Sequence, residues 1–157
     1  MSLLKTVGEE VFLKRAQEIT ASQPLYSWLG ARVAEVSEGF CELQLGLRDE
    51  FFNDRNTLQA KVIFALLDAA TFVASRTLAR DRNEVDFHQE IKLNFISAVR
   101  EVNQTIIAKG RALHRGRSTA VVEGEVYDQS GKLVAKALGT IAILKPPPAN
   151  SHSTVFK

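Results

Sequence analysis

The strongest constraint on the fold is one stretch, residues 62–74, which is apolar on nearly every side of a helix. A helix that is apolar all round must be buried, because no side of it can face water favourably. Its residues are mostly small, with alanine at four positions, so that a sheet can close tightly around it. We therefore predict a buried helix over residues 60–80 at the centre of the domain.

The segments on either side have the period-two pattern of strands. Residues 40–47 alternate between apolar and polar side chains, as a half-buried strand does. Similar patterns predict strands at 31–37, 85–97, 104–113, 118–127 and 133–144. Short turns join the last four, which we expect to form an antiparallel meander. One helix facing six strands predicts an α+β domain in which an antiparallel sheet wraps around the helix.

Two further helices are predicted before the first strand. A rough apolar stripe indicates a helix over residues 9–21, and Pro24 then interrupts the chain. A short helix over residues 25–29 is expected to end at Gly30. The polar residues 49–57 are expected to form the loop that leads into the central helix.

The composition suits one domain and argues against several kinds of partner. Hydrophobic residues make up 45% of the 157 residues, so a sizeable core is available. We expect residues 1–145 to form one domain and residues 146–157 a flexible tail. A net charge of +2 gives no general attraction for nucleic acid or an anionic membrane, and no apolar stretch is long enough to span a bilayer. A single cysteine, Cys41, and the lack of a signal peptide favour the cytoplasm, and no Cys/His cluster predicts a metal site.

Asp68 is the residue of the central helix that needs an explanation. It is the only ionisable residue between Lys61 and Arg76. Burying an unpaired carboxylate costs several kcal/mol, and buried aspartates nearly always have partners. A functional role is one explanation, and a structural ion pair at a subunit contact is the other.

Residues 53–70 resemble the signature of the phenylacetate-pathway (PaaI-like) hotdog thioesterases. In that pattern an Asn in the loop precedes His-Gly-Gly at the helix start, and an acidic residue follows nine positions after the His. Asn53, Gln59 and Asp68 occupy these three positions here, and the likeness extends over residues 25–144. The resemblance implies a hotdog fold, an acyl-CoA thioesterase activity and self-association as a homodimer or homotetramer.

The chain departs from the family at the helix start, where Gln59, Ala60 and Lys61 replace His-Gly-Gly. The helix N-terminus still offers free N–H groups to an anion. Lys61 either blocks this site or adds a positive charge to it. The helix start and Asp68 are about 12 Å apart along the axis, and Gln59 and Asp68 face opposite sides of the helix. In the family the helix start of one subunit meets the acidic residue of its partner, and this spacing is compatible with that arrangement.

The resemblance implies a role for each of these residues. The N–H of Ala60, with that of Lys61, would stabilise the oxyanion of a thioester. Asp68 of the other subunit would act as a general base or as a nucleophile. Asn53 and Gln59 would orient the water or the carbonyl. No cofactor is expected, since CoA enters as part of the substrate.

Five further residues are candidates for substrate binding. The planar guanidinium of arginine suits phosphate, so Arg115, Gly116 and Arg117 could hold CoA, with a solvated hairpin turn as the alternative. Phe72 could line an acyl pocket, and core or interface packing is the alternative. Asp86 could help to position water, and a solvated carboxylate at the strand end is the alternative.

Two other functions compete with hydrolysis. A hotdog dimer that binds an acyl-CoA or a related ligand without turnover would explain the altered helix start. A hotdog dehydratase is disfavoured, because the His-containing signatures of those families are absent. His88 and His114 have no Ser or Cys partner at motif spacing, and we expect both to be structural.

Overall fold

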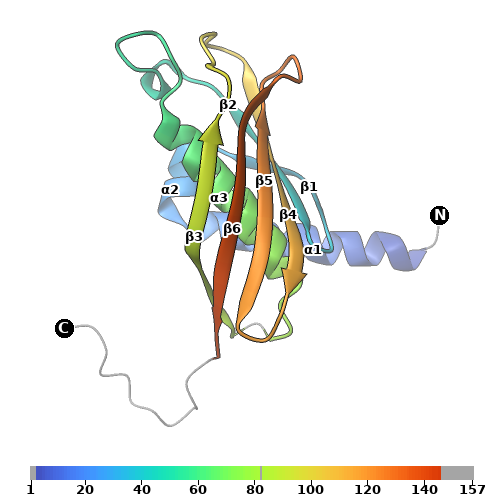
Figure 1. The fold of residues 1–157 in the computed structure, drawn as a ribbon. Helices are drawn as coiled ribbons and strands as arrows, with labels where there is room; N and C mark the ends of the chain where they lie inside the picture. Colours follow the sequence, from blue (N-terminus) through green and yellow to red (C-terminus); the bar gives the residue numbers. More distant parts are fainter. Residues whose placement is uncertain (1–2, 82, 146–157) are drawn as a thin grey trace.

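The structure, a computed structural model, describes residues 3–81 and 83–145. In these residues a six-stranded antiparallel sheet curls around one long helix (Figure 1). The elements in chain order are α1 (Leu3–Ala21), α2 (Pro24–Leu29), β1 (Arg32–Ser37), β2 (Phe40–Gly46), the 3-10 turn η1 (Asp49–Phe51), α3 (Ala60–Thr77), β3 (Val85–Phe95), β4 (Thr105–Arg115), β5 (Thr119–Tyr127) and β6 (Leu133–Leu144). The α+β prediction, with a sheet of six strands around a central helix, is confirmed.

Most predicted elements lie within a few residues of the observed ones. The central helix α3 begins at Ala60 as predicted and ends at Thr77, three residues early. The first helix is longer than predicted and begins at Leu3. The flexible tail that we predict for residues 146–157 falls outside the described residues.

The strand order corrects the predicted meander. The order across the sheet is β1-β2-β4-β5-β6-β3, so β4, β5 and β6 do form a meander, but β3 pairs with β6 at the edge. The reason is the connection after β3, residues 96–104, which is too long for a tight hairpin and carries the chain past two strands. As a result, β3 has one edge without a partner strand in the described chain.

The centre of the core is the contact between α3 and the middle of the sheet. Leu66, Leu67 and Val73 are fully buried there. The approach is so close that a Cβ added to Gly110 of β4 would lie 2.3 Å from the carbonyl oxygen of Ala70. Glycine at this position of the sheet therefore lets the helix backbone rest directly on the strand.

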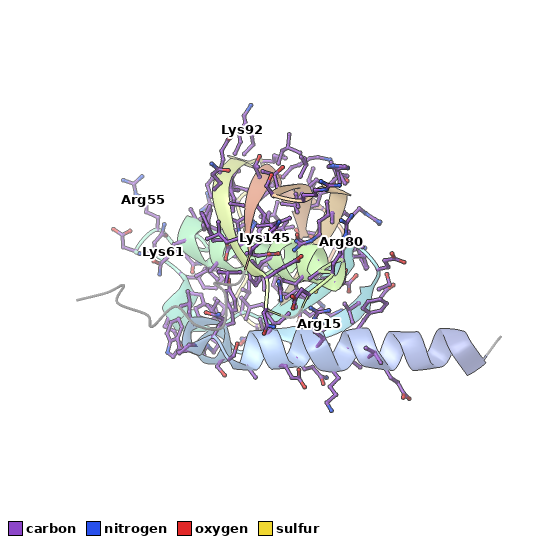
Figure 2. All side chains as sticks on the ribbon, turned by 90° about the horizontal axis from the view of Figure 1, so that it is seen from below. Arg15, Arg55, Lys61, Arg80, Lys92 and Lys145 are labelled. Atoms are coloured by element: carbon purple, nitrogen blue, oxygen red, sulfur yellow. The ribbon has the colours of Figure 1, made fainter. Side chains whose placement is uncertain are left out.

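Two features of the surface bear on assembly. The N-terminal part of α1 extends beyond the body of the domain (Figures 1 and 2). Large apolar side chains are exposed on the edge strand β3 and directly after it, namely Val85, Phe87, Phe95 and Ile96. No described helix is long and apolar enough to cross a membrane.

Candidate active site

Asp68 lies in the middle of α3 and has two partners from other elements. Its Oδ2 accepts a hydrogen bond from the hydroxyl of Tyr26 in α2, at 2.5 Å. Its Oδ1 lies 2.8 Å from Nδ1 of His88 in β3. The Asp68 side chain is 28% exposed, so it reaches the surface between α2 and β3. These two partners compensate the burial of a carboxylate within an apolar helix.

These contacts determine the ionisation of both acids. Burial raises the pKa of the Asp68 carboxyl, but the hydrogen bonds from His88 and Tyr26 outweigh it and hold that pKa below its usual value. Burial, followed by the hydrogen bond to Asp68, raises the pKa of the Tyr26 hydroxyl. At neutral pH Asp68 is therefore a carboxylate and Tyr26 is a protonated donor.

The ring of His88 is held on both sides. Since a carboxylate can only accept, Nδ1 carries the proton that is donated to Asp68. Nε2 lies 3.1 Å from Oγ1 of Thr71, which is one turn beyond Asp68 on α3. A β-bulge between His88 and Glu90 bends β3 at this point, and such bulges re-aim neighbouring side chains.

A second group of candidate residues lies at the start of α3. Gln59 is the N-cap residue, and its side chain does not cap the helix. Instead its Nε2 donates to the carbonyl oxygens of Glu50 and Phe52, at 3.2 Å each. These bonds fasten the η1 loop to the helix start and occupy both N–H donors of the amide. In this arrangement Gln59 therefore has no free N–H to donate to a substrate carbonyl. The sequence had led us to expect such a donation.

The side chain of Asn53 also forms hydrogen bonds within the loop. Its Oδ1 accepts the backbone N–H groups of Arg55 and Thr57, at 3.0 Å each. This closes the polar turn and leaves the amide nitrogen of Asn53 as the group that could reach a ligand. Ala60, the first residue of α3, is exposed, and its N–H belongs to the first turn, where N–H groups have no partner within the helix.

Two apolar pockets flank this helix start, each of about 390 Å³. The lining of the first includes Leu25, Trp28 and Leu29 of α2 with Lys61, Val62 and Ala65 of α3. The lining of the second includes Asn53, Ala60, Ile63, Phe95 and Ile96. Lys61 is exposed at the rim of the first pocket, on the side of the molecule that also carries Arg55 (Figure 2). A carbonyl at the helix start could thus have an apolar group on either side.

One chain keeps these two groups of residues apart. Ala60 and Asp68 are eight residues apart on a straight helix, or about 12 Å. Tyr26 and His88 contact Asp68. Asn53, Gln59 and Lys61 lie together at the helix start. Phe72 lies beside His88, with ring centroids 6.3 Å apart, and belongs to the Asp68 group.

Arg115 is engaged within the protein, which argues against the predicted role in binding CoA phosphate. The side chain is only 5% exposed. Its Nη1 donates to Asp86 and Ser75, and its Nη2 donates to Asp86 and Glu84, at 2.7 to 3.0 Å. Arg115 therefore ties β4 to β3 and the end of α3, and its terminal nitrogens are not available to a phosphate.

Asp86 also differs from both predictions made for it, a carboxylate that positions water and a solvated carboxylate at the strand end. Its carboxylate is fully buried and accepts from Arg76 as well as Arg115, so it is neither solvated nor free to position water. The prediction failed because Asp86 points inward on β3, towards arginines of α3 and β4. Gly116 forms the β4–β5 turn, where its N–H donates to Thr119, and Arg117 is exposed there. Phosphate binding by Arg117 stays a prediction.

Comparison with known proteins finds a family model and solved structures that this chain resembles. Residues 62–135, from α3 into β6, match the family model described as the thioesterase superfamily. The fold superimposes on that of the PaaI protein from the E. coli phenylacetic acid degradation operon with a TM-score of 0.80. The match covers 88% of this chain and 97% of that one, at 18% identity.

The chain has the hotdog fold, and part of it matches the thioesterase superfamily model.

Curated relatives resemble this hotdog chain over most of its length. A Saccharolobus solfataricus protein, whose name marks it as a candidate esterase, is 29% identical over 87% of this chain and 90% of its own length. A Listeria monocytogenes protein, named as a 1,4-dihydroxy-2-naphthoyl-CoA hydrolase, is 27% identical over 77% of this chain and 96% of its own. Thioester hydrolysis is the reaction named by the matched family model and by the Listeria relative.

Sequence reasoning missed both partners of Asp68 in this hotdog site. Tyr26 is 42 residues away in the sequence, and no pattern connects it to Asp68. A signal for His88 did exist. It lies two residues after Asp86 on β3, so it shares the inward face of that strand, next to the central helix.

Proposed function

We propose that the chain is an acyl-CoA thioesterase that works as a homodimer or a dimer of dimers, with each active site formed by two chains. The start of α3 from one chain would bind the thioester carbonyl, and Asp68 of the other chain would act on water. The separation of the two groups by about 12 Å on one rigid helix carries this proposal. An ionised acid and an accessible helix N-terminus suit the same reaction, but only a second copy can bring them together.

The free edge of β3 supports a dimer of this kind. A second copy could add its own β3 there and continue the antiparallel sheet. The exposed apolar side chains Phe87 and Phe95 of β3 would then lie at the interface between the chains. His88 belongs to β3 and touches Asp68, so this interface would bring the Asp68 group close to the partner chain.

The mechanism follows from the groups that remain free. The N–H groups of Ala60 and Lys61 hydrogen-bond to the carbonyl oxygen and stabilise its negative charge as water adds. Asp68 of the partner chain takes the proton from that water while the new C–O bond forms. The C–S bond then breaks, and the proton held by Asp68 passes to the departing CoA thiolate. A carboxylic acid and free CoA are the products, and no cofactor takes part.

General base catalysis is favoured over nucleophilic attack by Asp68. Each of its carboxylate oxygens already accepts one protein hydrogen bond, from Tyr26 or His88. One remaining lone pair is enough to take a proton from water. Direct attack on carbon would require an oxygen to approach without steric interference from these donors.

The substrate is proposed on two grounds. The Listeria relative is named as a hydrolase of an acyl-CoA. Apolar pockets flank the helix start, as an acyl group and a pantetheine arm would require, and Lys61 at the rim supplies a positive charge for phosphate. A cytoplasmic location is part of the same proposal.

A binding protein without turnover is the second candidate. It is favoured by the amide of Gln59, which is bound to the loop and replaces a histidine in the family pattern. Incubating the purified protein with a panel of acyl-CoAs and a thiol reagent separates the two functions. Release of CoA that is lost in Asp68→Asn supports the enzyme. Thermal stabilisation by the same ligands without release supports the binder and contradicts our proposal.

A further inference from the structure

We propose that His88 and Tyr26 are positioning residues for the reaction, which together fix the orientation of the Asp68 carboxylate, with Thr71 holding the His88 ring in place. This inference rests on the proposed function of Asp68. Neither residue belongs to the family signature at the helix, and each reaches Asp68 from a different element of the fold.

The two donors hold the two oxygens of the carboxylate from two different elements. Tyr26 on α2 binds Oδ2, and His88 on β3 binds Oδ1. A carboxyl group with a bond at each oxygen cannot rotate without breaking one of them. The 28% of the Asp68 side chain that remains exposed is thus presented in one orientation. A general base needs such fixed geometry, because small misplacements of a reacting group lower the rate strongly.

His88 acts through Asp68 and does not contact the substrate. Its side chain is only 10% exposed, and both ring nitrogens are engaged, with Asp68 and with Thr71. Oγ1 of Thr71 also lies 3.0 Å from the carbonyl oxygen of Leu67, so its own position is fixed within α3. The ring is therefore held by the same helix that carries the carboxylate.

Tyr26 connects the carboxylate to the wall of a pocket. It belongs to the six-residue helix α2, which begins at Pro24 and is followed by Gly30 in a left-handed conformation. Other side chains of α2, Leu25, Trp28 and Leu29, line the pocket beside Lys61. The same short helix thus supplies the hydroxyl of Tyr26 to Asp68 and three other side chains to the pocket proposed for the substrate.

The effect of the two donors on the pKa of Asp68 gives the inference a measurable consequence. Among the described residues, the titratable groups that bind Asp68 are Tyr26 from α2 and His88 from β3. Both donate to the ionised form and lower its pKa. With the burial of Asp68 unchanged, loss of either donor is therefore expected to move the titration of Asp68 to higher pH.

A matched pair of variants at position 88 tests the inference. In His88→Asn the side-chain amide nitrogen can take the place of Nδ1 and keep the bond to Asp68. In His88→Gln it can take the place of Nε2, which keeps the contact with Thr71 and loses the bond to Asp68. Tyr26→Phe removes only the hydroxyl. The readouts are the titration of the Asp68 carboxyl by carbon-13 NMR, the pH profile of kcat, KM and the melting temperature.

We expect His88→Gln and Tyr26→Phe to titrate Asp68 at higher pH and to lower kcat by about 10- to 100-fold, with KM changed little. His88→Asn should restore most of kcat and the wild-type titration. The inference is overturned if all three variants keep the wild-type titration. It is also overturned if Asn and Gln at position 88 lose kcat equally, in proportion to a loss of thermal stability. Loss of activity in Asp68→Asn together with either result leaves the proposed function standing and removes only the positioning role.

Discussion

Arg115 of β4 binds both carboxylate oxygens of Asp86 on β3, at 2.7 and 3.0 Å, although two strands separate β4 from β3 in the sheet. Both side chains are nearly excluded from solvent. Arg115 also donates a hydrogen bond to Ser75 near the end of α3. A bidentate bond between arginine and carboxylate is among the strongest that proteins form. At this end of the domain a cluster of charged side chains therefore holds β3, β4 and α3 together, whereas apolar packing holds the rest of the core.

Replacing Arg115 should cost stability and not substrate affinity. Arg115→Ala leaves part of the buried charge of Asp86 uncompensated, and breaking a buried pair in this way typically costs about 3–5 kcal/mol. Urea denaturation measures the change. Arg117→Ala, at the exposed end of the same turn, is the control and should stay within about 0.5 kcal/mol of the wild type. A stable Arg115→Ala protein with a raised KM for acyl-CoA would favour phosphate binding over the cluster of charged side chains.

The close packing of α3 on β4 predicts that Gly110→Ala is strongly destabilising. The added Cβ would lie 2.3 Å from the carbonyl oxygen of Ala70, and both groups are attached to backbone. Helix and strand must move apart, which costs about 1–3 kcal/mol or more. Gly46→Ala is a matched control, because a Cβ there meets no atom within 4 Å. Equal melting temperatures for the two variants would contradict the observed contact.

The pKa of Asp68 predicts the response of stability to acid. The hydrogen bonds from His88 and Tyr26 lower this pKa below the usual 3.8, despite burial. A group with a depressed pKa in the folded state stabilises the protein above its unfolded pKa, and the contribution is lost as pH falls through the folded pKa. The free energy of unfolding should thus fall less steeply below about pH 4 in Asp68→Asn than in the wild type. Parallel curves for the two proteins would show that Asp68 is not stabilised as a carboxylate.

Lys61 is expected to bind a CoA phosphate at the rim of its pocket. Lys61→Ala should raise KM for an acyl-CoA several-fold, as the loss of one exposed charge pair would. KM for the corresponding acyl-pantetheine, which lacks the nucleotide phosphates, should not change. Arg55→Ala, on the same side of the molecule but absent from the pocket lining, serves as the control (Figure 2). If Lys61→Ala lowers KM for both substrates, the side chain obstructs the site.

The sequence predicted those parts of the fold that local pattern determines. The all-round apolar character of α3 identified the buried helix, and alternation of apolar and polar residues located β2. The neighbours of β3 depend on where residues 96–104 carry the chain, and periodicity carries no information about that. The position of Asp68 was predictable because one charge in an apolar helix is visible in the sequence. Tyr26, His88 and Arg115 act through pairings between distant elements, which appear only once the sheet is closed around the helix.

The claim that each active site contains two chains can be tested by mixing two inactive variants. Asp68→Asn removes the base. Ala60→Pro removes one oxyanion donor at the first helical position, where proline fits the helix and the extended Gln59 before it. Unfolding and refolding the two variants together produces mixed dimers. Each contains one site with an intact helix start from one chain and an intact Asp68 from the other, so about a quarter of wild-type activity should return. If the refolded mixture stays as inactive as its components, while the melting temperatures show that both chains are folded, the two groups do not meet across chains and the account is wrong.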